Sequence, residues 1–282
     1  MKSERTITVV GSVNIDLVVE MDALPQAGET VLGKTFRVTP GGKGANQAVA
    51  AARLGARTEF VGCVGDDEYG RTARRNLIDQ GVGVAGLRTV DDHTGVALIM
   101  VDSEGRNMIS VAPGANRRAS GAGGRAIGAG GYDIVVTQLE TPYEPIRGAR
   151  CVILNPAPAA PVDVDGVDVI IPNEIEAEQL TGCADPADAA RALEAMGARR
   201  AIITLGADGV WDRELKPAFA VDAIDTVGAG DTFVGGFAAA LALGVDDPVR
   251  FGQAAAALQC TRPGAQNVPS RAEVEKFLAA PP

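Results

Sequence analysis

Four runs of sequence determine the fold: ITVV at residues 7–10, QAVAAARL at 47–54, FVGCV at 60–64 and YGRTARRNLIDQ at 69–80. The first and third runs are short and apolar, whereas the second and fourth carry the spacing of apolar residues that suits a helix. Strands that alternate with helices are typical of a parallel sheet covered by helices. The sequence therefore predicts an α/β fold with a mostly parallel central sheet flanked by helices.

The same alternation continues towards the C-terminus. Further strands are predicted at residues 134–138, 151–154, 167–171 and 201–205. Further helices are predicted at residues 174–181, 187–196, 229–243, 248–260 and 272–278. A chain of 282 residues is long enough for one large domain, or for one domain with a smaller appendage.

Two stretches interrupt this rhythm, at residues 17–38 and 94–111. In the second, strands at 96–101 and 107–111 flank a turn at 102–106. Both stretches have the pattern of hairpins, which do not join a parallel sheet easily. We expect them to form a small separate β-sheet that covers a cleft as a lid. The alternative is that they are surface hairpins with no role in binding.

Composition limits the classes of partner. The net charge is −10 and aromatic residues make up 4% of the chain, which argues against a nucleic-acid surface of basic and aromatic side chains. No apolar run approaches the roughly 18 residues of a membrane span, and the polar start of the chain has no signal-peptide pattern. The 4 cysteines form no Cys-x-x-Cys pair and there is 1 histidine, so no zinc site is expected. We expect a cytoplasmic protein with reduced thiols that binds neither nucleic acid nor membranes.

The stretch DTVGAGDTF, at residues 225–233, combines an anion site with an acid. Gly228 and Gly230 flank Ala229, so the backbone can turn tightly and direct several N–H groups to one point before the following helix. A helix N-terminus carries about half a positive charge, which suits a phosphate group. Asp231 adds a carboxylate at the same place. Two interpretations follow: Asp231 performs chemistry, or it only satisfies free amides of the first helical turn.

A second glycine-rich stretch, PGGKGANQA at residues 40–48, leads into a helix. Its glycines allow close backbone approach, while Lys43 and Asn46 supply donors that suit hydroxyl groups or phosphate. The spacing is not that of a Walker A loop. Upstream, Asn14 and Asp16 suit vicinal sugar hydroxyls, since one carboxylate can accept from two adjacent hydroxyl groups. The alternative is that this pair only forms a turn.

Together with other motifs, these stretches make the chain resemble the PfkB family of carbohydrate kinases over nearly its whole length. The motifs are GSVNID (11–16), GGKGANQA (41–48), TGVALI (94–99), LETP (139–142), NPAPA (155–159), PNEIEAE (172–178), TLGADG (204–209) and DTVGAGDTF (225–233). GGKGANQA favours the ribose-specific branch. The resemblance implies a three-layer ribokinase-like fold in a single domain over residues 1–282, with the hairpins as its lid. It implies ATP-dependent phosphorylation of D-ribose at the 5-hydroxyl group.

The resemblance also implies roles for individual residues. Asp231 would be the base that takes the proton from the attacking sugar hydroxyl, and the amides of Gly228, Ala229 and Gly230 would form an anion hole for the transferred phosphoryl group. The residues expected to hold the pentose are Asn14, Asp16, Gly42, Lys43, Asn46 and Glu140. The residues expected along ATP are Asn173, Thr204, Gly206 and Gly209, with Gln253 near the adenine end.

Two metal ions, magnesium and potassium, are implied in the same way. Glu176 is linked to magnesium and phosphate positioning, although Asn173 and Glu176 also have the spacing of a helix capping box, and both roles can coexist. A monovalent cation, usually potassium, would bind beside the anion hole. The residues matched to that cation are Asp225, Val227, Gln259, Arg262 and Gly264. The stretch QNVP at residues 266–269 lacks the serine expected just before its Val-Pro pair, so one ligand has no counterpart.

Other departures from the family pattern lie in the middle of the chain. Residues 119–131 are mostly glycine and alanine, which weakens any helix there. Between Glu140 and the strand that begins at Cys151 the connection is short and contains Pro142 and Pro145. A parallel crossover usually needs a dozen or more residues, and proline limits a helix. A shortened or missing crossover helix is therefore predicted.

Two other functions remain open from the sequence. One is a kinase of the same fold that acts on deoxyribose, fructose or a nucleoside such as adenosine, which GGKGANQA disfavours. The other is a non-catalytic sugar or nucleotide sensor on a kinase scaffold, which the loss of Asp231 or its glycines would favour. Lids of this family commonly pair two subunits, so the resemblance implies a homodimer through the lid.

Overall fold

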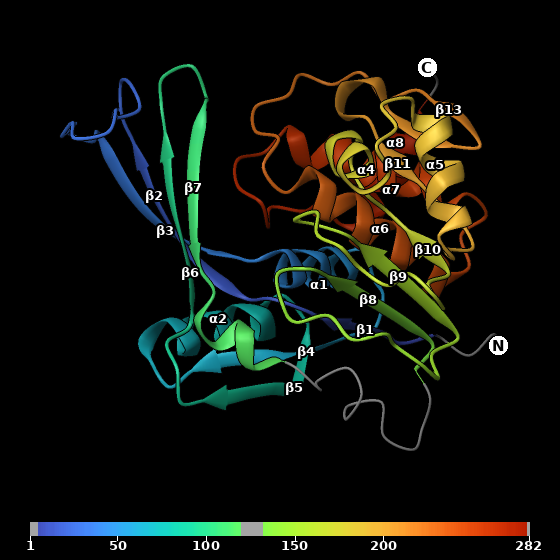
Figure 1. The fold of residues 1–282 in the computed structure, drawn as a ribbon, viewed down its shortest axis with the longest axis horizontal. Helices are drawn as coiled ribbons and strands as arrows, with labels where there is room; N and C mark the ends of the chain where they lie inside the picture. The colour runs from blue at the N-terminus through green and yellow to red at the C-terminus, as the bar shows by residue number, and fades with distance from the viewer. Residues whose placement is uncertain (1–4, 120–131, 281–282) are drawn as a thin grey trace.

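The computed structural model describes residues 5–119 and 132–280, with a six-stranded sheet at its centre (Figure 1). The strand order is β10-β9-β8-β1-β4-β5, and every pairing in this sheet is parallel. The strands are β1 (Ile7–Val10), β4 (Thr58–Gly65), β5 (Gly83–Val90), β8 (Ile134–Gln138), β9 (Cys151–Asn155) and β10 (Val169–Ile170). Strands β1 and β8 are buried along their whole length, as expected of a parallel sheet covered on both faces. The predicted parallel sheet is confirmed.

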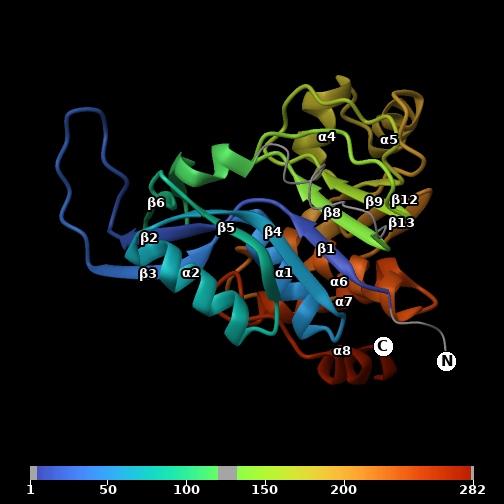
Figure 2. The same ribbon diagram turned by 90° about the horizontal axis from the view of Figure 1, so that it is seen from below.

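Helices cover both faces of this sheet (Figure 2). One face carries α1 (Lys43–Arg53), α6 (Ala229–Leu243), α7 (Pro248–Cys260) and α8 (Arg271–Ala279). The other face carries α4 (Glu174–Thr181) and α5 (Pro186–Ala195). Helix α2 (Glu68–Asp79) packs against β4 and β5. These layers confirm the predicted three-layer α/β fold.

Small residues allow α1 and α6 to pack closely together. Helix α6 is buried from Asp231 to Ala240. A Cβ atom at Gly235 would lie 2.5 Å from the carbonyl oxygen of Gln47, so glycine is required where the two helices meet. Together with the hydrogen bonds from Asn46 and Gln47 to Asp231, this contact places the first halves of the two helices side by side.

A second sheet stands away from the core as the predicted lid (Figure 1). Its order is β3-β2-β6-β7, and its strands are β2 (Asn14–Glu20), β3 (Thr35–Gly41), β6 (Gly95–Val101) and β7 (Asn107–Ala112). Strands β6 and β7 form the predicted hairpin, and β2 pairs antiparallel with β3. The separate layer is confirmed. The parallel pairing of β2 with β6, which joins the two hairpins, was not predicted.

The remaining elements are short. A small sheet contains β11 (Ile203–Thr204), β12 (Val210–Asp212) and β13 (Glu214–Lys216), and two 3-10 helices are η1 (Gly114–Ala119) and η2 (Gly206–Asp208). The sequence did not predict β5, β12 or β13. Residues 139–150 contain no helix, so the predicted loss of a crossover helix is confirmed.

Other sequence predictions concern the glycine- and alanine-rich segment, membrane-spanning helices and the number of domains. Residues 120–131 of the glycine- and alanine-rich segment lie outside the described residues. Within the described ranges, no helix has the length and apolar character needed to cross a membrane. The assignment of residues 1–282 to a single domain stays a prediction.

Candidate active site

Polar residues collect where the strands of the parallel sheet end. Ser12, Gln138, Asn155 and Asn173 lie at or just after the carboxyl ends of β1, β8, β9 and β10, the edge at which ligands bind in open α/β sheets. A cavity of about 210 Å³ opens there. The residues that line it are Lys43, Asn155, Ala157, Ile171, Asn173, Glu176, Thr204, Gly228, Gly230, Asp231 and Val234. The structure therefore brings together residues that the sequence assigned to sugar, nucleotide and catalysis.

Asp231 is held by the helix beside it. It lies in the first turn of α6 and is 8% exposed. Asn46 Nδ2 donates to one carboxylate oxygen at 2.9 Å, and Gln47 Nε2 donates to the other at 2.9 Å. Hydrogen bonds to both oxygens fix the plane of the carboxylate, so its remaining lone pairs have a defined direction.

Gln47 is the residue of this cluster that the sequence did not single out. Its side chain is fully buried on α1, and Nε2 also donates to Asn155 Oδ1 at 3.0 Å. Its own oxygen accepts from Gln138 Nε2 at 2.6 Å, which fixes the orientation of the amide. A glutamine on the otherwise apolar face of a helix was the available signal, because buried polar groups are normally hydrogen-bonded.

The mouth of α6 has the shape expected of the glycine motif. Gly228 adopts a left-handed conformation, with φ 78°, and precedes the helix without a side-chain cap. A Cβ atom at Gly228 would lie 2.7 Å from the side chain of Ala265, so glycine is required here. The amide of Ala229 donates to the carbonyl of Thr226 at 3.2 Å, whereas Gly228 and Gly230 line the cavity.

The predicted sugar residues of β2 lie against the start of α1. Gly42 has φ 92°, and a Cβ atom there would lie 2.8 Å from the backbone nitrogen of Asn14. The Asn14 oxygen accepts from Asn116 Nδ2 at 2.7 Å. A Cβ atom at Gly41 would lie 2.2 Å from a carboxylate oxygen of Asp16. The glycines therefore let the loop close over Asn14 and Asp16.

Four carboxylates and one ammonium group share this region. Burial, and then the charges of Glu140 and Asp231, raise the pKa of Asp16 to about 7. Burial lowers the pKa of Lys43, but the carboxylates of Asp231, Glu140 and Glu176 more than offset this, and the pKa is raised above its ordinary value. Lys43 therefore stays charged beside the carboxylates.

Glu140 is fixed by the loop between β1 and β2 and by the first turn of α1. The Ser12 hydroxyl donates to Glu140 Oε2 at 2.5 Å, and the backbone N–H of Lys43 donates to the same oxygen at 3.0 Å. The missing crossover helix after Glu140 therefore leaves this carboxylate in contact with the cluster.

The model of the pfkB family of carbohydrate kinases matches this chain over residues 4–123 and 147–272. The chain belongs to this family. It is 41% identical to the ribokinase of Haemophilus influenzae over 302 residues, covering 97% of this chain and 98% of that protein. It is 38% identical to a deoxyribokinase of Salmonella typhi over 259 residues, covering 82% and 84%. The structure of Arabidopsis thaliana ribokinase complexed with ribose and ATP is similar, with 31% identity, a TM-score of 0.83 and 99% coverage of both chains.

The opposite side of the kinase cavity carries the predicted nucleotide residues. Asn173 caps α4, and together with Glu176 it forms a capping box: Glu176 N–H donates to Asn173 Oδ1 at 2.7 Å, and Asn173 N–H donates to Glu176 Oε2 at 2.9 Å. The structural role of this pair is therefore confirmed. Burial raises the pKa of Glu176, although the amide of Asn173 and the charge of Lys43 work against the rise. Thr204 forms an isolated parallel β-bridge with Asn173, and both residues line the cavity.

Three predicted nucleotide residues do not line the cavity of the kinase. Gly206 is the first residue of η2, and Gly209 follows its last residue. A Cβ atom at Gly209 would lie 2.2 Å from the carbonyl oxygen of Lys216. Gln253 is buried on α7, and its Nε2 donates to that same carbonyl oxygen at 2.9 Å. Its oxygen accepts from Arg250 at 3.2 Å. In this arrangement Gln253 supports the loop after β13.

The residues matched to a monovalent cation bind one another. Gln259 is fully buried, and its Nε2 donates to the carbonyl oxygens of Val227 at 2.9 Å and Gly264 at 3.0 Å. The Asp225 carboxylate accepts from the amides of Val227 and Gly264 at 2.9 and 2.8 Å. The side chain of Arg262 forms an ion pair with helix α8. The carbonyl oxygens that would hold a cation are bound to an amide, so the residues present do not fit one.

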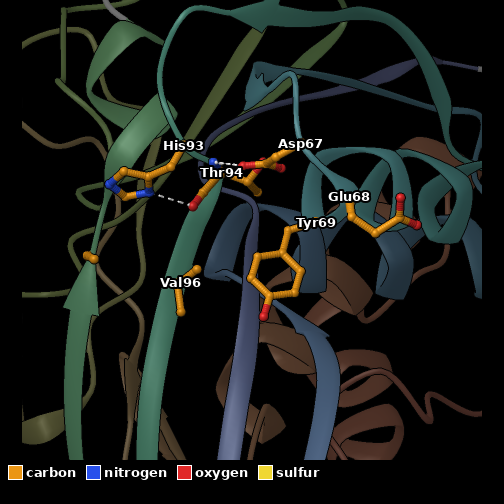
Figure 3. Close-up of a pocket in the computed structure, with 7 residues that line it drawn as sticks. Asp67, Glu68, Tyr69, His93, Thr94 and Val96 are labelled. Atoms are coloured by element: carbon orange, nitrogen blue, oxygen red, sulfur yellow. Dashed lines mark hydrogen bonds between the residues drawn. The ribbon is translucent and has the colours of Figure 1, made fainter.

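A larger cavity of the kinase, about 500 Å³, lies between α2 and the lid strands (Figure 3). Asp67 caps α2 there and accepts from the amide and the hydroxyl of Thr94, at 2.8 and 2.6 Å. His93 Nδ1 lies 2.9 Å from the Thr94 carbonyl oxygen. Thr94 donates to the Asp67 carboxylate and the walls of this cavity are mostly apolar, so this cavity is not the candidate active site.

Proposed function

We propose that this kinase transfers the γ-phosphoryl group of ATP to the 5-hydroxyl group of D-ribose. The single observation that carries the proposal is the position of Asp231. It lies at the mouth of α6, receives a hydrogen bond from Asn46 on the sugar side, and lines the same cavity as Asn173 and Thr204 on the nucleotide side. The ribokinase relatives, one of them complexed with ribose and ATP, support this choice of substrates.

In this mechanism Asp231 accepts the proton of the attacking hydroxyl group. Phosphoryl transfer passes through a loose transition state, so the protein mainly positions groups and stabilises charge, and a strong base is not needed. The backbone amides of Gly228, Ala229 and Gly230 stabilise the charge on the transferred group. The bond from Ala229 to Thr226 has to open or be shared when that amide binds the phosphoryl oxygen.

The remaining predicted residues divide between the two substrates. Carboxylates accept from vicinal hydroxyl groups and amides donate to them, which suits a pentose. We assign the sugar to Asn14, Asp16, Gly42, Lys43, Asn46 and Glu140. We assign ATP to Asn173, Thr204, Gly206 and Gly209, whereas the contacts of Gln253 favour a supporting role behind the adenine end.

Magnesium fits the nucleotide side of this site. One Glu176 oxygen accepts from the amide of Asn173 while the carboxylate lines the cavity, and carboxylate oxygen is the ligand that magnesium prefers. Magnesium usually keeps several waters and binds through one or two carboxylates together with substrate phosphates. Bound there, it would offset the charge of ATP.

One assay tests the proposed function: release of ADP with a panel of pentoses, hexoses and nucleosides. We expect kcat/KM to be highest for D-ribose, with 2-deoxyribose as the main competitor because a deoxyribokinase is among the relatives. A higher value for deoxyribose, fructose or adenosine would transfer the assignment to that substrate. Absence of sugar-dependent ADP release would contradict the enzyme and favour a sensor.

We also propose a homodimer through the lid and a cytoplasmic location. The strand register places four exposed apolar side chains on the lid face opposite to Asp16, namely Phe36, Val38, Leu98 and Met108. Contiguous apolar patches of this kind mark protein interfaces. Light scattering should give a dimeric mass that Leu98→Asp lowers to a monomeric one; a monomeric wild type would contradict the dimer.

The proposed cytoplasmic location rests on the reduced-thiol pattern of the sequence. Fractionation of the source cells tests it.

A further inference from the structure

The loop that supports the mouth of α6 is organised by one buried amide. Gln259, near the C-terminal end of α7, directs Nε2 to the carbonyl oxygens of Val227 and Gly264, at 2.9 and 3.0 Å. Both are ordinary N–H···O distances. One side chain therefore joins the residue before Gly228 to the loop that follows α7.

The same amide leaves its oxygen without a partner. Among the described residues, Gln259 Oε1 is buried and accepts no hydrogen bond. Turning the amide by half a rotation would place this oxygen against two carbonyl oxygens, which repel it. The two donor contacts therefore determine the orientation, even though a buried acceptor is left unsatisfied.

A cation held by these carbonyl oxygens would need the space that the Gln259 amide occupies. Admitting it would break both hydrogen bonds, and the buried Nε2 would lose its acceptors. The two N–H groups already bring partial positive charge to the carbonyl oxygens. The serine missing from residues 266–269 also removes one expected ligand. Both observations point away from a cation site.

We infer that the side-chain amide of Gln259 takes the place of the monovalent cation, so that this kinase works without potassium. The inference rests on the proposed function, because the expectation of a cation comes from the family resemblance. Its structural consequence concerns the anion hole. Ala265, next to Gly264, packs on Gly228, so the amide that holds Gly264 also holds the glycine whose backbone faces the cavity.

The test compares potassium chloride with tetramethylammonium chloride at equal ionic strength, using ATP and sugar free of other monovalent metal ions. Wild type should keep its turnover within about twofold, and its thermal unfolding midpoint should not rise with potassium. Gln259→Glu replaces the donor by a carboxylate of the same shape, which faces two carbonyl oxygens and needs a cation between them. This variant should lose about tenfold or more in turnover without potassium, and its midpoint should rise when potassium is added.

Gln259→Ala and Gln179→Glu complete the set. The alanine variant frees the two carbonyl oxygens without adding charge, and it should also gain a potassium response. It therefore tests the inference even if the glutamate variant does not fold. Gln179 is exposed on α4, so Gln179→Glu should behave as wild type. A wild type that loses more than about tenfold in turnover without potassium, or whose midpoint rises with it, would overturn the inference. Variants at Gln259 that fold and stay indifferent to potassium would also overturn it. If no sugar supports ADP release, the proposed function fails, while the unfolding midpoints still decide the role of Gln259.

Discussion

The two sides of the cavity differ in what holds their side chains. On the sugar side, Asn14, Asn46 and Asp231 are 3%, 7% and 8% exposed, and each is hydrogen-bonded to another buried side chain. On the nucleotide side, Asn173 and Gly206 are exposed. The sugar side is therefore organised before a ligand binds, whereas the nucleotide side takes part of its contacts from the ligand itself.

This difference predicts how the two sides respond to substitution. A preorganised group acts in a site that excludes water, where electrostatic and hydrogen-bond contacts are strong and no reorganisation is needed during the reaction. An exposed group competes with water, so its loss is partly compensated. We therefore expect large effects on turnover from the sugar side and small effects from the nucleotide side.

Asp231→Asn should give the largest effect. The amide keeps the size of the side chain but cannot accept the proton of the sugar hydroxyl. Turnover measured by ADP release should fall about a hundredfold or more, while ATP binding measured by calorimetry stays close to that of wild type. Turnover within about threefold of wild type would remove Asp231 from catalysis and leave it a structural residue that joins α6 to α1 through Asn46 and Gln47.

Asp16 should make the sugar side respond to pH. Burial, then Glu140 and Asp231, raise its pKa to about 7. If the ionised form binds two sugar hydroxyl groups, kcat/KM for ribose should fall about tenfold for each pH unit below that pKa. Asp16→Asn should lower kcat/KM and remove this pH dependence, whereas Asp222→Asn, at an exposed position, should keep it. An unchanged inflection near pH 7 in Asp16→Asn would assign the titration to another group.

The same pKa has a consequence for stability. The folded state of the chain holds the Asp16 proton more tightly than the unfolded state, whose carboxyl group has its ordinary value of 3.8. The stabilising contribution is therefore complete below that value and is lost as the pH rises through about 7. Unfolding measured from pH 4 to pH 8 should show a smaller decline in Asp16→Asn than in wild type, and equal declines would contradict the raised pKa.

Sequence reasoning succeeded where local pattern decides the outcome. Strand β8 and helices α6 and α7 match the expected boundaries, because each has a continuous apolar or helical pattern between clear stops. The capping box at Asn173 and Glu176 was also readable from spacing. Strand β5 was missed because GVAGLRTV contains two glycines and is only partly buried, so its strand character depends on pairing with β4.

The site shows the corresponding limit. The glycine motifs and Asp231 could be predicted because their chemistry is local to one helix N-terminus. The roles of Gln47 and Gln259 could not, because each amide acts on a residue far away in the chain. Only the packing of α1 and α7 beside α6 determines which carboxylate or carbonyl each one reaches. Gln253 shows the reverse case, since tertiary contacts engage a side chain that the family resemblance had assigned to the nucleotide.

Gln47→Met tests whether the hydrogen bond from Gln47 to Asp231 contributes to turnover. Methionine keeps the approximate volume but removes the donors to Asp231 and Asn155. We expect turnover to fall about tenfold with little change in either KM, because the lost contact acts on the base. The unfolding free energy should fall by about 1–3 kcal/mol. Gln179→Met, at an exposed site, is the matched control. A less stable variant with normal turnover would limit Gln47 to a structural role.

Glu176→Gln, on the nucleotide side, should give the smallest effect. This variant separates the helix-capping role of Glu176 from its proposed magnesium-binding role. The glutamine oxygen can still accept from the amide of Asn173, so the capping box is retained and the unfolding free energy should change by less than about 0.5 kcal/mol. The lost charge should raise the magnesium concentration needed for half-maximal turnover by about threefold to tenfold. Glu178→Gln changes the same charge on the exposed part of α4 and should leave that concentration unchanged. If Glu176→Gln keeps both its stability and the magnesium response of wild type, Glu176 is only a cap. A loss in turnover as large as that of Asp231→Asn would show that the nucleotide side is as strictly organised as the sugar side.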